Sequence, residues 1–350
     1  MTAFLLPADV DDVAFASGGN TYDRRMCEVL GLRQVPVRGT WPVPDTASRV
    51  ALDRALGEVP DGEVVLVDGL VACGVPAVVV PHARRLRLAV LLHLPLGDET
   101  GLSNDRAVEF DALERETLRE AFAVVATSPW ARRRLIGLHR LDPDRVHVVE
   151  PGTDPAPPAA GGDGTRLLCL ASVTPRKGHD LLAEALADLA DLSWTCECVG
   201  SVRRDPEHVE RVRDLIDRHG LGGRMTLAGA LPDAELDGSL HETDLLVLPS
   251  RRETYGMVVT EALARGIPVL TTAVDALPDT LGQAPGGGVP GILVPPGDAP
   301  ALADALRRWL TEPPLRERLR ERAHKRELDD WDTAAGHLAD VLDRLRGEPW

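Results

Sequence analysis

Two glutamates in one short stretch, Glu253 and Glu261, are the residues best placed for chemistry. Glu253 stands in a polar loop after an apolar run, 245–248, that is typical of a buried strand, and Glu261 lies about one turn into the helix expected after Gly256. In strand–loop–helix units, ligands bind at the carboxyl end of the strand, where the helix N-terminus favours an anion. Two carboxylates beside an anion site suggest a phosphate that carries hydroxyl-rich groups.

Two cations, Arg176 and Lys177, stand at the equivalent place in a second unit of this kind. They follow an expected strand at 167–171 and precede an expected helix at 179–190. An arginine fork beside a lysine point charge suits a diphosphate. Such a pair is also typical of a solvated basic surface, so the residues alone leave both interpretations open.

Both motifs together resemble the retaining glycosyltransferases of the GT-B fold, family 4 (glycosyl transferases group 1). Glu253-x7-Glu261 is similar to the family's Glu-x7-Glu motif, and Pro175-Arg176-Lys177-Gly178 is similar to its pyrophosphate loop. The resemblance implies an α/β protein with two Rossmann-like, doubly wound domains that face a central cleft. It also implies transfer of a hexose-type sugar from a nucleoside diphosphate sugar, UDP- or GDP-linked, to a hydroxyl acceptor.

The resemblance also assigns roles to individual residues. It places Glu253 on the donor sugar's hydroxyls, Glu261 on the ribose, and Arg176 and Lys177 on the pyrophosphate. Leu231 is then expected near the nucleotide base. The donor site that the resemblance implies is completed by Gly18, Gly19, Thr254, Gly256, Met257 and Val258.

Two features of the first half of the chain join this site only through the resemblance. Gly18 and Gly19 precede an expected helix, where an ordinary turn and a phosphate-binding or sugar-binding loop are both consistent with the residues. His93 directly follows an expected strand at 89–92, and it could equally be a hydrogen-bonded loop histidine. The resemblance places the glycines near the donor phosphates and the acceptor, and His93 near the reacting centre without requiring it to be a general base.

Apolar runs alternate with amphipathic stretches along the chain, which predicts doubly wound α/β domains. We expect a first domain at 1–155, a linker at 156–164 and a second domain at 165–330, and the resemblance returns a last helix at 331–350 to the first domain. Strands of the first domain are expected at 3–6, 64–67, 77–80, 89–92, 123–126 and 146–149, and helices at 21–30, 47–56 and 105–121.

Composition narrows the class of protein. The 350 residues include 39 Lys+Arg and 55 Asp+Glu, a net charge of -16, which argues against nonspecific nucleic-acid binding. The five cysteines form no Cys-x-x-Cys pair, so we expect buried core thiols in a reducing compartment rather than a metal or redox site. Neither a membrane-spanning run nor a signal peptide is evident, so a cytoplasmic protein is expected. No cofactor and no metal are expected.

Three further patterns in the sequence are weaker evidence for a function. The segment 130–141 carries Arg132, Arg133 and Arg134 beside apolar residues, which suits either an anionic membrane or phosphorylated acceptor, or more simply a solvated face. Asp9-x-Asp11 mimics a metal-binding pair but is expected to be a solvated turn. No Gly-x-Gly-x-x-Gly follows a strand, so dinucleotide binding has no support.

Two rival functions keep the same fold. One is a nucleotide-sugar epimerase or hydrolase, and the other is a non-catalytic nucleotide-sugar-binding protein. The acceptor, whether a glycan, a lipid or a small natural product, is left open by the sequence, as are the donor's base and sugar.

Overall fold

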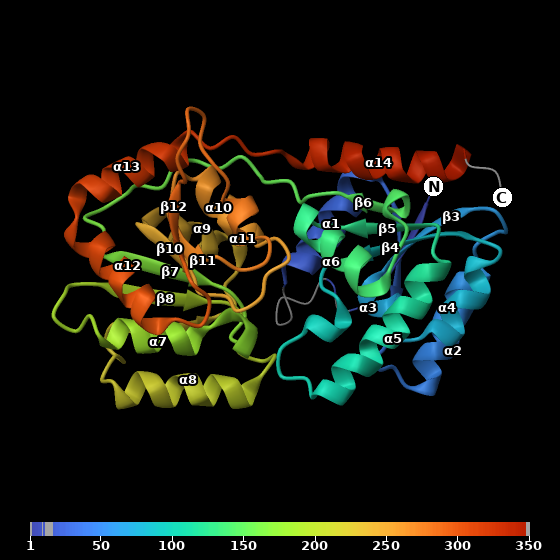
Figure 1. The fold of residues 1–350 in the computed structure, drawn as a ribbon, viewed down its shortest axis with the longest axis horizontal. Helices are drawn as coiled ribbons and strands as arrows, with labels where there is room; N and C mark the ends of the chain where they lie inside the picture. The colour runs from blue at the N-terminus through green and yellow to red at the C-terminus, as the bar shows by residue number, and fades with distance from the viewer. Residues whose placement is uncertain (1, 9, 11–16, 348–350) are drawn as a thin grey trace. The chain divides into compact units, whose positions relative to one another are not determined.

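The computed structural model describes residues 2–8, 10 and 17–347. The chain forms two compact units (Figure 1). Unit 1 comprises Met1–Asp12, Gly19–Gly152 and Asp329–Trp350, and unit 2 comprises Val13–Gly18 and Thr153–Leu328. Asp9 and Asp11, the pair expected in a turn, lie outside the described residues.

Unit 1 is built on a six-stranded sheet with the order β2-β1-β3-β4-β5-β6, in which all neighbours are parallel. The chain first moves outward from β1 to β2 and then crosses back to β3 on the other side of β1. The strand order therefore reverses between β1 and β3. The strands are β1 (Ala3–Pro7), β2 (Arg33–Val37), β3 (Val64–Asp68), β4 (Arg87–Leu92), β5 (Ala123–Ala126) and β6 (Val146–Val148).

Helices connect these parallel strands, as crossover connections require. The last helix of the chain, α14 (Trp331–Gly347), belongs to unit 1 and contacts β3 and β4. The remaining helices are α1 (Gly18–Leu30), α2 (Thr46–Gly57), α3 (Gly69–Ala72), α4 (Pro76–Ala83), α5 (Asn104–Glu120) and α6 (Pro129–His139), with 3₁₀ turns at η2 (Leu96–Asp98) and η3 (Pro143–Arg145).

Unit 2 has a second parallel six-stranded sheet, with the order β12-β11-β10-β7-β8-β9. Counted from its own first strand, this is the 3-2-1-4-5-6 order of the Rossmann fold, and the order reverses between β7 and β10. The strands are β7 (Arg166–Leu170), β8 (Thr195–Val199), β9 (Met225–Gly229), β10 (Leu245–Leu248), β11 (Val269–Thr272) and β12 (Gly291–Val294).

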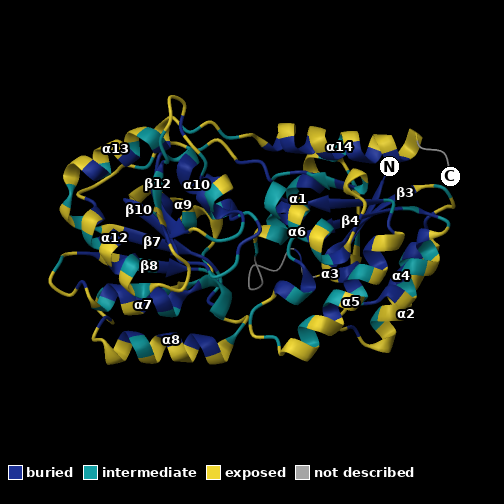
Figure 2. Ribbon diagram, in the orientation of Figure 1, coloured by how far each residue is buried: buried dark blue, intermediate teal, exposed yellow. Residues whose placement is uncertain are grey.

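The central strands of unit 2, β7, β10 and β11, are buried on both faces (Figure 2). Leu167 and Cys169 of β7 belong to the core on one face, whereas Leu168 and Leu170 belong to the core on the opposite face, as the two-residue period of a strand requires. The covering helices are α7 (His179–Ala187), α8 (Pro206–Arg218), α9 (Asp233–Glu242), α10 (Met257–Ala264), α11 (Leu277–Leu281), α12 (Ala299–Thr311) and α13 (Pro313–His324), with a 3₁₀ turn at η4 (Pro175–Lys177).

One strand expectation is wrong. Residues 77–80, which are rich in valine, lie in α4 and not in a strand. Pro76 occupies the first turn of that helix, where its fixed φ is suitable, and Val79 is fully buried. A short apolar run cannot be assigned to a strand or a buried helix from periodicity alone. Strand β2 was not predicted, because Pro36 interrupts it.

The stretch expected to be a linker, 156–164, is attached to unit 2. Ala159 and Ala160 donate backbone N–H groups to the carbonyls of Arg265 and His241, at 2.9 and 2.8 Å. Gly164 donates to the buried carboxylate of Asp244. The boundary between the units falls earlier, at 152/153, and the second crossing falls at 328/329. The Pro- and Gly-rich stretch 156–164 therefore follows an irregular, mostly exposed path along unit 2.

Candidate donor-binding site and its relatives

The two loops with the predicted motifs follow the two strands between which the order of the unit 2 sheet reverses. Arg176 and Lys177 follow β7, and Glu253 follows β10, its neighbour in the sheet. Carboxyl ends of adjacent parallel strands meet at one sheet edge, and ligands bind at this reversal in open α/β sheets. The fold therefore brings together two motifs that lie 76 residues apart in the chain.

Arg176, Lys177 and Glu253 form one charged cluster. The Lys177 ammonium donates to Oε2 of Glu253, and Arg176 Nη1 lies 3.7 Å from its Oε1. Glu253 is 6% exposed. Burial by itself would raise the pKa of Glu253, but Lys177 and Arg176 outweigh it and hold that pKa below its ordinary value. Glu253 is therefore ionised at neutral pH, and its two cations have a carboxylate partner before any phosphate arrives.

A second layer of charges, which the sequence interpretation missed, joins the two loops. Arg251 donates to both carboxylate oxygens of Asp180, each at 2.8 Å, and its backbone N–H donates to the carbonyl of Arg176. Asp275 accepts from the Arg252 side chain at 2.8 Å and from the Glu253 backbone N–H at 3.0 Å. The adjacent Arg251-Arg252 pair before Glu253 was the available signal, but its partners lie far away in the sequence.

The loop after β10 ends at Gly256, whose φ of 88° is in the left-handed region. A Cβ there would lie 2.8 Å from Leu277 and 3.3 Å from Glu253, so only glycine fits this start of α10. Among the residues that the structure describes, no side chain caps α10, which leaves its first turn suited to an anion. Thr254 and Met257 are buried beside this turn, and Val258 is half-buried.

Glu261 lies on α10, one turn beyond its start, and is half-buried. Burial raises the pKa of Glu261 to about 7, with Arg265 lowering it and Asp154 raising it. Unlike Glu253, this carboxyl group changes its charge near neutral pH. Leu231 follows β9 and is partly buried against the apolar cluster on one face of the sheet.

In unit 1, His93 follows β4 as expected and packs against Gly19 of α1. A Cβ on Gly19 would lie 3.0 Å from the His93 ring, so the missing side chain allows this approach. His93 Nε2 lies 2.8 Å from Asp23 and 3.6 Å from Asp68, two buried carboxylates that no motif indicated. Gly18 is exposed at the start of α1. Gly19 and His93 are therefore adjacent in the fold.

Arg133 and Arg134 of α6 border a groove of about 840 Å³ in unit 1. Arg115 and Arg119 of α5 donate to the carbonyls of Leu138 and His139 at the end of α6, where cations are favoured. Arg134 pairs with both oxygens of Asp98. These contacts give several of the arginines a structural role. Within the described chain, every helix is too short or too polar to cross a membrane.

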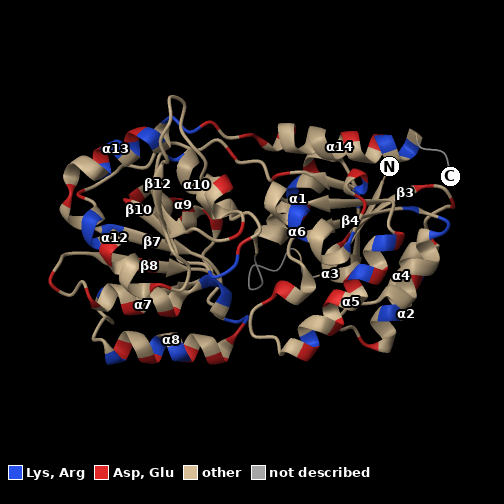
Figure 3. Ribbon diagram, in the orientation of Figure 1, with Lys and Arg blue, Asp and Glu red and all other residues tan. Residues whose placement is uncertain are grey.

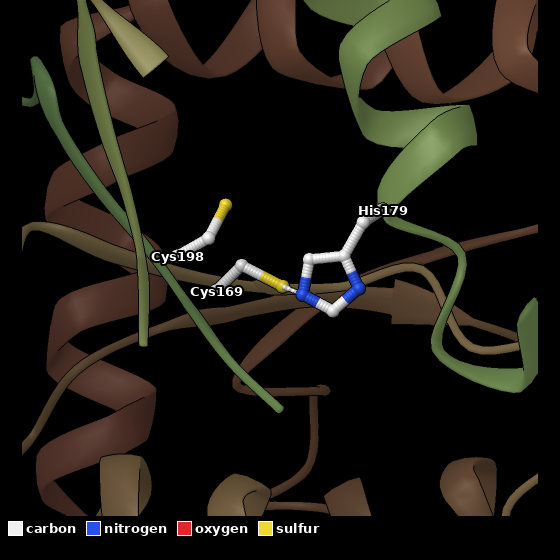
Figure 4. A group of neighbouring side chains, drawn as sticks. All are labelled: Cys169, His179 and Cys198. Carbon is white, nitrogen blue, oxygen red and sulfur yellow. Dashed lines mark hydrogen bonds between the residues drawn. The ribbon is translucent and has the colours of Figure 1, made fainter. Parts of the chain in front are cut away.

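A cluster with metal-ligand residue types lies in the core of unit 2, where the thiol of Cys169 points at the imidazole of His179, with Cys198 beside them (Figure 4). Cys169 Sγ lies 3.6 Å from His179 Nε2, and all three residues are buried. The hydrogen bond with Cys198, and then burial, raise the pKa of the Cys169 thiol. For Cys198, the hydrogen bond with Cys169 lowers the pKa, but the hydrogen bond with Cys196 and burial outweigh it, so the pKa is raised and both thiols stay protonated. Structural zinc sites take four protein ligands, and the described residues group three here. That these cysteines are core residues and not metal ligands stays a prediction.

Two family models cover almost the whole chain. The model described as "Glycosyl transferases group 1" matches residues 153–326, and the "Glycosyl transferase 4-like domain" matches residues 5–152. These ranges meet where unit 1 passes into unit 2. The chain belongs to the group 1 glycosyltransferases of the GT-B fold.

Relatives and solved structures agree with this family. D-inositol 3-phosphate glycosyltransferase of Kineococcus radiotolerans is 31% identical over 61% of this chain and 54% of its own length. D-inositol 3-phosphate glycosyltransferase 1 of Catenulispora acidiphila is 28% identical over 93% and 84%. HepE of Anabaena, solved with UDP-glucose, matches with a TM-score of 0.75 at 17% identity, covering 98% and 99%. The chain spans about half the length of several of the curated relatives that it matches.

Proposed function

We propose that this group 1 family member is a retaining glycosyltransferase that moves a hexose-type sugar from a nucleoside diphosphate sugar to a hydroxyl acceptor. The observation that carries the proposal is the convergence of Arg176, Lys177 and Glu253 at the strand reversal of unit 2, beside the uncapped start of α10. That arrangement offers cations and N–H groups for a diphosphate and carboxylates for hydroxyl groups.

In the proposed reaction, Arg176, Lys177 and the first turn of α10 hold the donor diphosphate. Breaking the bond between the sugar and the phosphate oxygen leaves negative charge on that oxygen, and these donors stabilise it. The leaving phosphate then accepts the proton of the acceptor hydroxyl as the new glycosidic bond forms on the same face of the sugar. The side-chain cations neutralise the diphosphate, so we propose no metal requirement.

Glu253 and Glu261 divide the recognition of the donor. Glu253, in the loop and beside the cations, accepts hydrogen bonds from the sugar's hydroxyls. Glu261, one turn along α10, accepts hydrogen bonds from the two ribose hydroxyls. A site built on hydrogen bonds to hydroxyl groups rejects analogues that lack them, because its buried polar groups are then left without partners.

The test is incubation of the purified chain with UDP- and GDP-sugars and an acceptor panel, followed by mass spectrometry. The solved relative with UDP-glucose and the relatives named for D-inositol 3-phosphate supply the first pair to try. A new glycoside whose anomeric configuration matches the donor, formed equally well with EDTA, supports the proposal. Inversion of that configuration would contradict the retaining step.

A variant that lacks both cations tests their role in the proposed transfer, and the reaction products separate this function from its rivals. Arg176→Ala/Lys177→Ala should slow transfer by about 10²-fold or more, because the leaving diphosphate loses its cations. Arg211→Ala/Arg213→Ala, which removes two exposed arginines of α8, is the matched control. Donor conversion without glycoside formation would indicate an epimerase or hydrolase, and nucleotide-sugar binding without conversion would indicate a binding protein.

A further inference from the structure

His93 lies against two buried carboxylates of unit 1. Its Nε2 is 2.8 Å from Oδ1 of Asp23 and 3.6 Å from Oδ2 of Asp68. Asp23 and Asp68 are 2% and 4% exposed, so little water screens their charges from the imidazole. Both carboxylates face the same ring nitrogen, Nε2, which therefore interacts with them.

The three residues of this cluster follow or end three neighbouring strands of the unit 1 sheet, β1, β3 and β4, where the strand order reverses. Asp23 lies on α1 after β1, Asp68 ends β3, and His93 follows β4. Asp68 is fixed because its Oδ1 accepts the N–H of Leu70 at 2.7 Å and that of Val71 at 3.4 Å, capping α3. This leaves Oδ2 directed at His93. Backbone N–H groups of α3 therefore hold the Asp68 carboxylate of this cluster in position.

The ring of His93 is held from the side of α1 as well. Tyr22 meets it edge-on, with ring centroids 5.4 Å apart and an interplanar angle of 74°. Gly19 leaves room for the ring by lacking a side chain, as the 3.0 Å approach of a built Cβ shows. The contacts with Tyr22 and Gly19, together with the two carboxylates, fix the orientation of the imidazole.

The titratable groups packed against the imidazole include Asp23 and Tyr22 of α1 and Asp68 of β3. Burial alone lowers the pKa of His93, but Asp23 and Asp68 together raise it to about 9. Burial and then Asp23 raise the pKa of Asp68 to about 7. Burial keeps the pKa of Tyr22 well above its ordinary value, so its phenol stays neutral. At neutral pH the imidazole is charged, and Asp23 is its closer carboxylate partner.

We propose that Asp23 and Asp68 are positioning residues that keep His93 as an imidazolium, so that His93 acts as a fixed cation and hydrogen-bond donor and not as a general base. The inference rests on the proposed function, whose oxygen-rich substrates such a cation suits. An imidazolium carries a proton on both nitrogens and has no lone pair with which to accept another. It fits a reaction in which the leaving phosphate takes the acceptor's proton.

The first experiment follows UDP release from UDP-glucose across pH 6 to 10. Activity should fall as the pH rises through the pKa of His93, because the cation is lost. Asp23→Asn removes the nearer carboxylate and should move that fall to lower pH by about 1–3 pH units. A rate that instead rises with pH, along a limb that moves down in Asp23→Asn, would show a neutral histidine acting as a base and overturn the inference.

The second experiment needs no turnover. NMR titration of the His93 ring protons, assigned by their loss in His93→Gln, should show an imidazolium at pH 7.5 in the unmodified protein. In Asp23→Asn, the imidazolium should lose its proton at a lower pH, closer to 7.5 or at it. Asp68→Asn mimics the protonated carboxyl group and retains an oxygen for the α3 cap, so it should have a smaller effect. A neutral His93 at pH 7.5 in the unmodified protein overturns the inference.

A matched control separates charge from folding. Glu114→Gln alters another buried carboxylate of unit 1, which lies 2.7 Å from His139 Nε2. It should lower the melting temperature without moving the pH dependence, and a shift equal to that of Asp23→Asn would overturn the specific role of Asp23. If the unmodified protein formed no glycoside from any UDP- or GDP-sugar with the acceptor panel, the proposed function would fail, while the NMR titration would still decide the charge of His93.

Discussion

The charge pairing of Glu253 changes what its substitution should do. A sequence interpretation treats Glu253 as a sugar ligand and Lys177 as a phosphate ligand, but the structure pairs them directly. Binding of a diphosphate must therefore draw the cations away from Glu253, or share them with it. The carboxylate holds two half-buried cations in place and, in the proposed function, competes with the ligand for them.

Glu253→Gln is the substitution that separates these two roles, because the amide has the same shape without the charge. Affinity for bare UDP should stay equal or rise, since Lys177 and Arg176 lose their competing partner. The kcat/KM for UDP-glucose should fall by about 10²-fold, as expected when a donor or acceptor aimed at the transition state is lost. Calorimetry with UDP and steady-state rates on one preparation check this. A parallel fall in both quantities would make Glu253 a nucleotide ligand or a structural residue.

Glu261 should make donor binding depend on pH. Its pKa of about 7 means that the carboxylate, the better acceptor for ribose hydroxyls, forms only as the pH rises through neutrality. UDP-glucose should therefore bind more tightly at pH 8 than at pH 6, and each lost charged hydrogen bond is worth roughly 1.5–3 kcal/mol. UDP-glucose is the right probe because its diphosphate has no terminal group that titrates in this range.

The measurement is calorimetric titration with UDP-glucose at several pH values. In Glu261→Gln, whose side chain does not ionise, the dependence should disappear and the affinity should match the weaker, low-pH value. Unchanged affinity across pH in the unmodified protein would remove Glu261 from the ribose site.

At the scale of elements, the loops of unit 2 depend on backbone approaches that only glycine allows. Gly178 has a φ of 72° and caps the start of α7. A Cβ there would lie 2.2 Å from the carbonyl oxygen of Pro249, in the loop after β10. This glycine therefore lets the loop with Arg176 and Lys177 lie against the loop with Glu253.

Gly178→Ala should destabilise unit 2 by about 3 kcal/mol, of which roughly 1–2 kcal/mol is the left-handed backbone and the rest is the contact with Pro249. Gly220→Ala is the control, because Gly220 has a φ of 66° and nothing within 4 Å of a built Cβ. Urea unfolding should show the smaller loss for Gly220→Ala, together with unchanged UDP affinity. Equal losses at both positions would show that the loop contact contributes nothing.

At the scale of the whole molecule, each unit has its own buried carboxylate that ties distant segments together. In unit 1, Glu114 accepts from Leu96 N–H at 2.9 Å and pairs with His139. In unit 2, Asp244 accepts from the N–H groups of Gly164 and Arg166 and from Arg320. Along α8, acidic and basic side chains are interspersed (Figure 3).

Glu114→Ala and Asp244→Ala should each destabilise one unit, by roughly 3 kcal/mol, because several hydrogen-bond donors lose the buried carboxylate that accepts from them. Hydrogen exchange should show faster exchange in unit 1 for Glu114→Ala and in unit 2 for Asp244→Ala. Glu114→Ala should leave the Kd for UDP within about threefold, since the proposed diphosphate ligands lie in unit 2, and RT ln 3 is only about 0.65 kcal/mol. Uniform acceleration along the whole chain would show a single cooperative unit instead.

What the sequence determined by itself is local. The polar loops with Arg176-Lys177 and Glu253-x7-Glu261 follow apolar strands, and this order along the chain was enough to place them at strand ends and to predict the α/β class. Hydrophobic periodicity failed where a short run was ambiguous, as at residues 77–80, because a buried helix and a buried strand present the same composition.

The tertiary structure alone decided which strand ends are neighbours. Strand order brings the Lys177 loop to Glu253 across 76 residues, and it brings Asp23 to His93 across 70. Neither contact leaves a periodic trace in the sequence, because the chain reaches each strand end through a crossover of variable length. The charge states of Glu253, Glu261 and His93 follow from those neighbours and from burial, and both arise only when the sheets have formed.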